Sequence, residues 1–224
     1  MNIAIIPARK NSARIKNKNI KIFRKKPIIF WTIKKAKESK IFDKILVSTD
    51  SKKISKIAKN YGAEVPFLRP KNLSGDGIPV KSVICHAIKF LKKRGIKVKN
   101  VCCLFPASPF ISKKNLLKGL KKIEKNKKTN FVFSVQKIDK SYARSFFFYK
   151  KKLKLLCKKF ESYNSQKIPE LYVDAGQFCW ATSKNWLSKR IFSTNSKIIK
   201  LKSNENVDIN TKSDWNRALK LGKK

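Results

Sequence analysis

Residues 5–19 read IIPARKNSARIKNKN, an apolar run that stops at Pro7 and continues as a loop with five cations, three asparagines and no carboxylate. A cationic loop at the end of a strand predicts an anion site, because guanidinium groups bind phosphate oxygens in pairs and lysines act as point charges. The glycine-rich phosphate patterns G-x-x-x-x-G-K-S/T and G-x-G-x-x-G are not found in this loop, so the contacts would come from side chains. The alternative is a solvated basic loop in a lysine-rich chain.

The strand–loop–helix order that begins here repeats along the chain. Unbroken apolar runs predict buried strands, and the stripe from Val80 to Leu91, with apolar residues at steps of three and four, predicts a helix. This alternation predicts a Rossmann-like α/β fold, a mainly parallel sheet with helices on both faces. Predicted strands are residues 2–6, 44–49, 64–68, 100–105 and 130–135, and predicted helices are 27–40, 51–61, one from 80 to near 95, and one after 112.

Four residues or pairs mark the expected helix ends. Pro27 suits the first helical position, Gly62 the position after a helix, and Ser112 an N-cap. Thr211-x-x-Asp214 forms a capping-box pattern, so Asp214 is interpreted as structural.

Ligands of such sheets bind beyond the carboxyl ends of the strands. The opening loop lies at such an end, and so do Asp50, the Arg69-Pro70 segment and residues 106–109. The sequence therefore predicts that these distant segments meet at one edge. Only 13 residues are acidic, which singles out Asp50, Asp76, Asp174 and Asp208 as candidates for a function.

The alternation breaks between about residues 139 and 172. Aromatic and lysine-rich runs there, such as residues 146–154, are typical of extended or hairpin structure. Because this stretch has no linker composition, we predict one domain over residues 1–224 with an inserted arm or lid at about 139–172.

A net charge of +43 raises the possibility of an RNA-binding protein. The lysines are spread over almost every segment, which favours solvated surfaces over a dedicated nucleic-acid site. Apolar runs are far shorter than the roughly 18 residues of a membrane span, and the first residues lack a signal-peptide pattern. We therefore expect a cytoplasmic protein without membrane contact, whose five cysteines are reduced and mostly buried.

Six segments, in order, resemble the nonulosonic-acid cytidylyltransferases, the family of CMP-sialic acid synthetases. They span nearly the whole chain, and the fifth is close to the D-A-G-Q-F-Y-W of the pseudaminic acid branch. The segments are I-I-P-A-R-x-N-S at 5–12 with Lys18-Asn19-Ile20, V-S-T-D at 47–50, L-R-P with L-S-G-D at 68–76, F-P-A-S-P at 105–109, D-A-G-Q-F-C-W at 174–180, and V-D-I-N-T at 207–211.

This resemblance implies a nucleotide-diphospho-sugar transferase fold and a reaction in surface-glycan biosynthesis. CTP and a nine-carbon 2-keto sugar acid, pseudaminic acid by the branch, would give the CMP-sugar and pyrophosphate with Mg²⁺. A homodimer built by the arm is also implied. Such a transfer needs positioning and charge neutralisation, and His86, the only histidine, is interpreted as structural.

The resemblance also implies roles for individual residues. Arg9, Lys18 and Asp208 would be catalytic, and Asp208 and Asn210 would hold the metal. Gln177 and Phe178 would face the sugar, and Arg144 would pair with its carboxylate. The expected CTP-binding residues are Arg9, Asn11, Ser12, Arg14, Lys18, Asn19, Arg69, Asp76 and Ser108.

Several alternatives remain at this point. Phe178 and Trp180 could be core residues, and Asp174 could cap a turn. Two departures bear on activity, because Ala13 stands where the family has lysine and Asn210 where it has a second aspartate. Alternatives for the function are another sugar nucleotidyltransferase, an inactive paralogue that binds CTP, or a basic RNA-binding protein.

Overall fold

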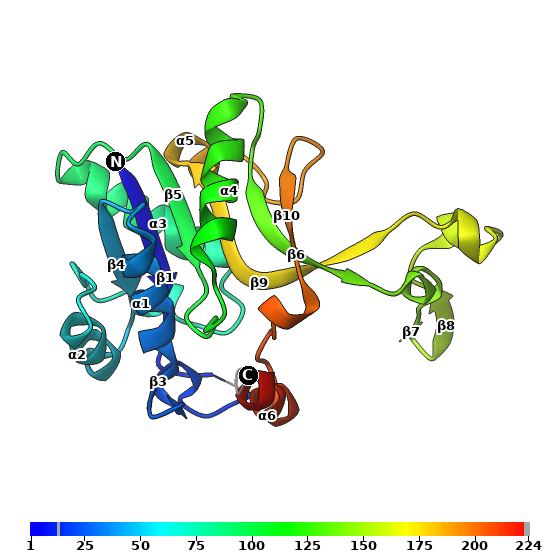
Figure 1. Cartoon of the computed structure of the whole chain (residues 1–224), viewed down its shortest axis with the longest axis horizontal. Helices are drawn as coiled ribbons and strands as arrows, with labels where there is room; N and C mark the ends of the chain where they lie inside the picture. Colours follow the sequence, from blue (N-terminus) through cyan, green and yellow to red (C-terminus); the bar gives the residue numbers. More distant parts are fainter. Residues whose placement is uncertain (13, 222–224) are drawn as a thin grey trace.

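The computed structural model describes residues 1–12 and 14–221, and these residues form a six-stranded sheet (Figure 1). β9 runs antiparallel to its neighbours β5 and β6, whereas the pairs β1–β4, β1–β5 and β6–β10 are parallel. The predicted mainly parallel sheet is therefore confirmed, and the antiparallel central strand is an addition. In spatial order the strands are β10 (Lys197–Leu201), β6 (Val132–Ile138), β9 (Leu171–Thr182), β5 (Asn100–Leu104), β1 (Asn2–Pro7) and β4 (Lys44–Ser48).

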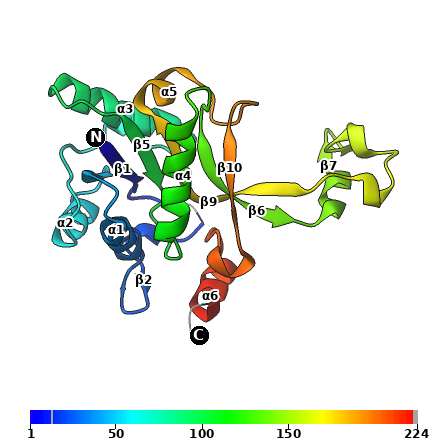
Figure 2. The same cartoon turned by 45° about the horizontal axis from the view of Figure 1, so that its top comes forward.

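Helices cover both faces of this sheet, as predicted (Figures 1 and 2). α1, α2 and α4 pack their apolar stripes on one face, and α3 and α5 pack on the other. None of the described helices is long and apolar enough to cross a bilayer. The helices are α1 (Ile28–Ser39), α2 (Lys52–Asn60), α3 (Val80–Lys93), α4 (Lys113–Lys125), α5 (Ser183–Ser188) and α6 (Lys212–Leu221).

The helix ends follow local chemistry. The Ser112 hydroxyl accepts a 3.2 Å hydrogen bond from the amide of Asn115, and Gly62 adopts φ +83° after α2. The capping box of α6 is present, since Thr211 and Asp214 each accept the other's backbone N–H through a side-chain oxygen. Pro27 differs from the prediction, because it takes the N-cap and not the first helical position.

The predicted strand at residues 64–68 is absent from the described structure. Two isolated bridges, Leu46 with Glu64 and Thr49 with Leu68, replace a continuous ladder. Pro66 lies between them and has no N–H to donate, which explains why the pairing is interrupted.

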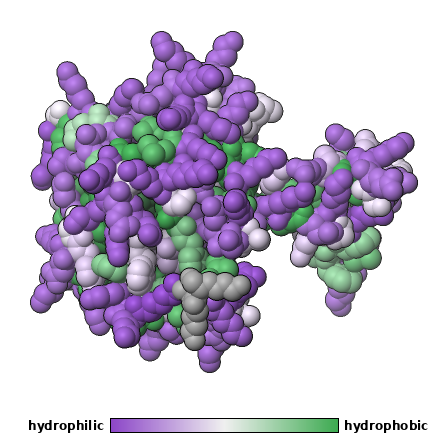
Figure 3. Space-filling view, in the orientation of Figure 1, coloured by the Kyte–Doolittle hydropathy of each residue, from purple (hydrophilic) through white to green (hydrophobic). Residues whose placement is uncertain are grey.

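The segment at 139–172 projects from the body as an arm (Figures 1 and 3). Its two legs are extensions of β6 and β9, which stay paired out to Ile138 and Leu171. The hairpin expected there is present as β7 (Phe146–Tyr149) and β8 (Lys152–Leu155). The two loop residues, Lys150 and Lys151, have φ +49° and +61°, as a type I′ turn requires.

Short 3₁₀ helices complete the connections, and the cysteines are free. None of the five cysteines forms a disulfide in the described structure, and burial raises the pKa of Cys103 and Cys179, which face each other on β5 and β9. The 3₁₀ helices are η1 (Lys18–Ile20), η2 (Lys71–Leu73), η3 (Lys140–Arg144), η4 (Lys158–Phe160), η5 (Ser165–Lys167) and η6 (Ser203–Glu205), and a short hairpin, β2 (Ile22–Phe23) and β3 (Lys26–Pro27), precedes α1.

Candidate active site

A cavity of about 520 Å³ lies at the carboxyl ends of β1 and β5, where the sequence predicts the site. Segments from the two ends of the chain meet in its wall, because residues 208–210 fold back against the opening loop. Ten of the predicted site residues line it: Arg9, Ser12, Arg14, Lys18, Asn19, Arg69, Asp76, Ser108, Asp208 and Asn210.

Lys18 is the most buried amine of the opening loop in this wall. Its Nζ donates a 2.7 Å hydrogen bond to the carbonyl oxygen of Ile209. Burial lowers the pKa of Lys18, while the charge of Asp208 acts in the opposite direction. A lysine held this way keeps a fixed position, and it is poorly hydrated, so an incoming anion gains more from it than from a surface lysine.

Two buried side chains of the cavity lining, Arg69 and Asn19, carry polar atoms without a partner among the described residues. Arg69 donates from Nη2 to the Ser48 carbonyl at 2.7 Å, but its Nε has no acceptor. Asn19 donates to the carbonyl of Arg9 at 2.9 Å, and its Oδ1 has no donor. Buried polar atoms are nearly always satisfied in native proteins, so these two side chains have unused hydrogen-bonding capacity beside the cavity.

One wall of the cavity carries two carboxylates. Gly176, with φ +58°, separates them; its N–H donates to Asp174 at 3.0 Å, and a Cβ at this position would lie 3.3 Å from Oδ1 of Asp208. Burial, and then the charge of Asp208, raises the pKa of Asp174. Sequence analysis singled out Asp174 as a candidate functional acid and gave a turn cap as the alternative. Asp174 caps this turn and also lines the cavity.

Asn210 stands between the cationic and acidic groups. Its Oδ1 accepts a 2.8 Å hydrogen bond from Arg14, and its Nδ2 donates a 2.6 Å hydrogen bond to Oδ2 of Asp208. The amide oxygen predicted to bind metal is therefore held by a guanidinium.

Ser108 closes the floor of the cavity from the Phe105–Pro109 turn. Its hydroxyl donates a 3.0 Å hydrogen bond to the carbonyl of Gly176, so the turn and the acidic wall are joined.

Four predicted residues lie outside the cavity lining. Gln177 is 2% exposed and points away from the cavity, where Nε2 donates to the Glu205 carbonyl at 2.5 Å. Phe178 is a core residue, which was the alternative interpretation. Arg144 lies on the arm and donates to the Tyr163 carbonyl, and Asn11 is exposed on the opening loop. Ala13, the other departure from the family pattern, falls outside the described residues.

The family model described as cytidylyltransferase matches residues 3–213. The chain belongs to the cytidylyltransferase family. This cytidylyltransferase is 35% identical to the pseudaminic acid cytidylyltransferase of Campylobacter jejuni, over 95% of this chain and 92% of that one. It is 31% identical to the CMP-N,N'-diacetyllegionaminic acid synthase of Legionella pneumophila, over 98% and 95% of the two chains.

Solved structures support the fold of this cytidylyltransferase. CMP:2-keto-3-deoxy-manno-octonic acid synthetase, solved in complex with CTP, superposes with a TM-score of 0.74 over 98% of this chain and 97% of that one. Since the two are only 13% identical in sequence, the likeness shows the nucleotidyltransferase fold alone.

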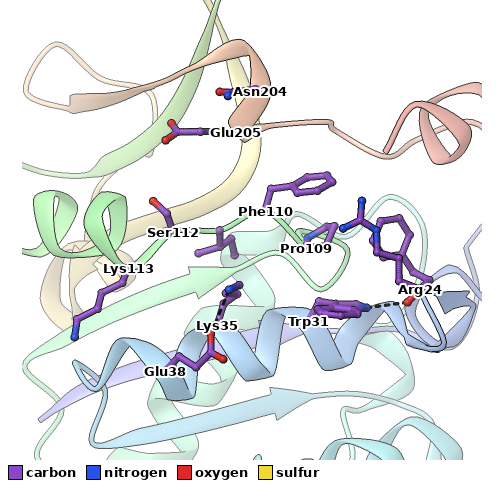
Figure 4. A pocket seen from close by; sticks show the side chains of 12 residues that line it. Arg24, Trp31, Lys35, Glu38, Pro109, Phe110, Ser112, Lys113, Asn204 and Glu205 are labelled. Carbon is purple, nitrogen blue, oxygen red and sulfur yellow. Dashed lines mark hydrogen bonds and ion pairs between the residues drawn. The ribbon is translucent and has the colours of Figure 1, made fainter. Parts of the chain in front are cut away.

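A second cavity of about 490 Å³ lies beside α1 on the same molecule (Figure 4). Phe23, Trp31 and Phe110 give it an aromatic floor, and Trp31 donates to the Phe23 carbonyl at 2.8 Å. Its lining includes no residue predicted for the active site of this cytidylyltransferase.

Proposed function

We propose that the chain transfers CMP from CTP to the anomeric hydroxyl of a nonulosonic acid, with pseudaminic acid as the acceptor, and releases pyrophosphate. One observation carries this proposal: the cations of the opening loop and the carboxylate of Asp208 line one cavity and are joined by the Lys18–Ile209 and Arg14–Asn210 hydrogen bonds. The likeness to the Campylobacter jejuni enzyme supports the choice of acceptor. Such a reaction belongs in the cytoplasm, where CTP is made, and would serve surface-glycan biosynthesis.

The reaction depends on neutralising the negative charge of the triphosphate and of the leaving pyrophosphate more than on proton transfer. The acceptor oxygen forms a bond to the α-phosphorus, the bond from that phosphorus to the pyrophosphate oxygen breaks, and the hydroxyl proton is released. Arg14 and Lys18 would hold the triphosphate and neutralise the charge that builds on the leaving group. Asn19 and Arg69 would meet the nucleoside with their unpartnered atoms.

The residues of the acidic wall fit Mg²⁺. Hard oxygen ligands suit this ion, and Mg²⁺ sites commonly combine one or two carboxylates with substrate phosphates. Asp208 and Asp174 would supply those carboxylates from the two sides of Gly176. Bound Mg²⁺ would draw charge from the phosphate oxygens during the transfer.

The test is pyrophosphate release with CTP, Mg²⁺ and a panel of pseudaminic, legionaminic, N-acetylneuraminic and 3-deoxy-manno-octulosonic acids. We expect the highest kcat/KM with pseudaminic acid. A higher value with another acid would reassign the acceptor. CTP binding without turnover on any acid would indicate an inactive paralogue, and a salt-dependent RNA shift without CTP binding would indicate an RNA-binding protein.

We also propose a homodimer in which the arm contacts a second copy. The support is apolar exposure, since Phe146, Phe148 and Tyr149 are 59%, 76% and 54% exposed on β7, and hydrophobic surface gathers on this part of the arm (Figure 3). Light scattering at micromolar concentration should give twice the chain mass for wild type and for the control Phe192→Glu on the body. Phe148→Glu should give a monomer. A monomeric wild type would contradict the dimer.

A further inference from the structure

The side chain of Asn210 links the cationic loop to the acidic wall through two hydrogen bonds. Its amide lies 2.8 Å from Nη2 of Arg14 and 2.6 Å from Oδ2 of Asp208. A guanidinium only donates and a carboxylate only accepts, so the amide is satisfied in one orientation alone, with oxygen toward Arg14 and nitrogen toward Asp208. The amide serves both neighbours at once, because it carries a donor and an acceptor.

The backbone of Asn210 is held independently of these two side chains. Its N–H donates a 3.1 Å hydrogen bond to Oδ2 of Asp214, the carboxylate that caps α6. On the other side, Lys18 binds the carbonyl oxygen of Ile209. The amide is thus presented by a helix cap and a buried lysine, and it can orient Arg14 and Asp208 without being placed by them.

A carboxylate at position 210 would behave differently. It would still accept from Arg14, but it would face Asp208 at a few ångströms with like charge, and such pairs are unfavourable until a cation separates them. It would also place a full negative charge beside the guanidinium of Arg14, which is proposed to bind the triphosphate.

We propose that Asn210 is a positioning residue that assembles the Arg14–Asp208 pair in the absence of metal, so that CTP binding depends less on Mg²⁺ in this chain than it would with aspartate. The inference rests on the proposed function, because it assigns Arg14 to the triphosphate and Asp208 to the metal. Asn210 acts through these two residues and is not itself a metal ligand.

The experiment is calorimetric titration of the full-length chain with CTP, in excess EDTA and in saturating Mg²⁺. The readout is the ratio of the Kd in EDTA to the Kd in Mg²⁺. For Asn210→Asp this ratio should be tenfold or more above the wild-type ratio, because Mg²⁺ restores the paired carboxylates. Asn210→Ala should weaken CTP binding in both buffers to a similar extent, since alanine cannot be rescued by metal.

Asn204→Asp is the matched control, because it makes the same charge change on an exposed residue outside this cavity and should keep the wild-type ratio. An Asn210→Asp ratio equal to the wild-type ratio would overturn the inference while leaving the proposed function intact. A wild-type chain that binds no CTP in either buffer would overturn both.

Discussion

The guanidinium of Arg9 forms an ion pair with the carboxylate of Asp76, across the mouth of the cavity. Arg9 follows β1, and Asp76 lies between Gly75 and Gly77; a Cβ at Gly75 would lie 3.8 Å from the Ile78 side chain, and one at Gly77 would meet nothing within 4 Å. Arg9, one of the cations expected to bind CTP, is therefore already paired with the carboxylate of Asp76. A triphosphate has to compete with Asp76 for this guanidinium.

Removing that competition should strengthen CTP binding. Asp76→Asn should lower the Kd for CTP by up to about fivefold, since an exposed pair of this kind is worth at most about 1 kcal/mol. Calorimetry checks the value, and Glu161→Gln on the arm is the charge-matched control. If Asp76 contacts CTP directly, as the family pattern implies, the Kd should rise instead.

Asp208→Asn should abolish turnover while the protein stays folded. Asp208 is exposed in the cavity wall and is not part of the core, so the amide removes charge without leaving a buried polar group. Pyrophosphate release across a Mg²⁺ titration measures the effect, with circular dichroism as the check on folding. Near wild-type turnover at every Mg²⁺ concentration would show that Asp208 is not a metal ligand.

Gln177→Ala should distinguish a structural role for Gln177 beside Asp208 from the predicted contact with the sugar acid. In the structure its amide binds the Glu205 carbonyl and Oδ1 of Asn206, two residues before Asp208. The change should lower the free energy of unfolding by about 1–3 kcal/mol, because these acceptors lose their donor. It should also raise the Mg²⁺ concentration for half-maximal activity and leave the KM for the sugar acid unchanged. A higher sugar KM would restore the predicted sugar contact, and Gln166→Ala serves as the control.

The free energy of unfolding should depend on pH between about pH 5.5 and 7 because His86 titrates in this range. Burial, and then the charge of Arg69, lowers the pKa of His86 below its unfolded value of 6.5. The unfolded chain therefore binds more protons, so the free energy of unfolding is highest above pH 6.5 and falls as the pH drops below it. Urea unfolding between about pH 5.5 and 7 should show this slope in wild type and lose it in His86→Gln. An unchanged slope in the variant would contradict the prediction.

Local chemistry predicted much of the fold, although Pro66 interrupts the strand predicted at residues 64–68. Ser112 and Gly62 mark helix ends through interactions with their nearest neighbours, and the strands that follow one another are buried and apolar. The antiparallel course of β9 was not predictable in this way. It depends on where the chain returns after the arm, and no local pattern encodes that direction.

The residues of the candidate site show the same difference between what local sequence predicts and what depends on distant partners. Arg9, Arg14 and Lys18 were identified because a cationic loop after a strand has a distinctive composition. Gln177, predicted to face the sugar, lies outside the lining of this cavity, because its burial depends on Asn206, a partner far along the chain. The bond from Arg14 to Asn210 spans nearly the whole sequence, and only the folded structure reveals it.

The arm and the cavity share one ladder. β6 and β9 pair Val135 with Asp174 at the cavity wall and Ile138 with Leu171 at the base of the arm. The register of this ladder shifts between Phe133 and Val135, opposite the positive-φ Gly176, and the pairing then continues inward to Val132 and Trp180. The arm and the acidic wall are therefore parts of one continuous two-stranded ribbon, and Asp174 lies on this ribbon three residue pairs inside the base of the arm.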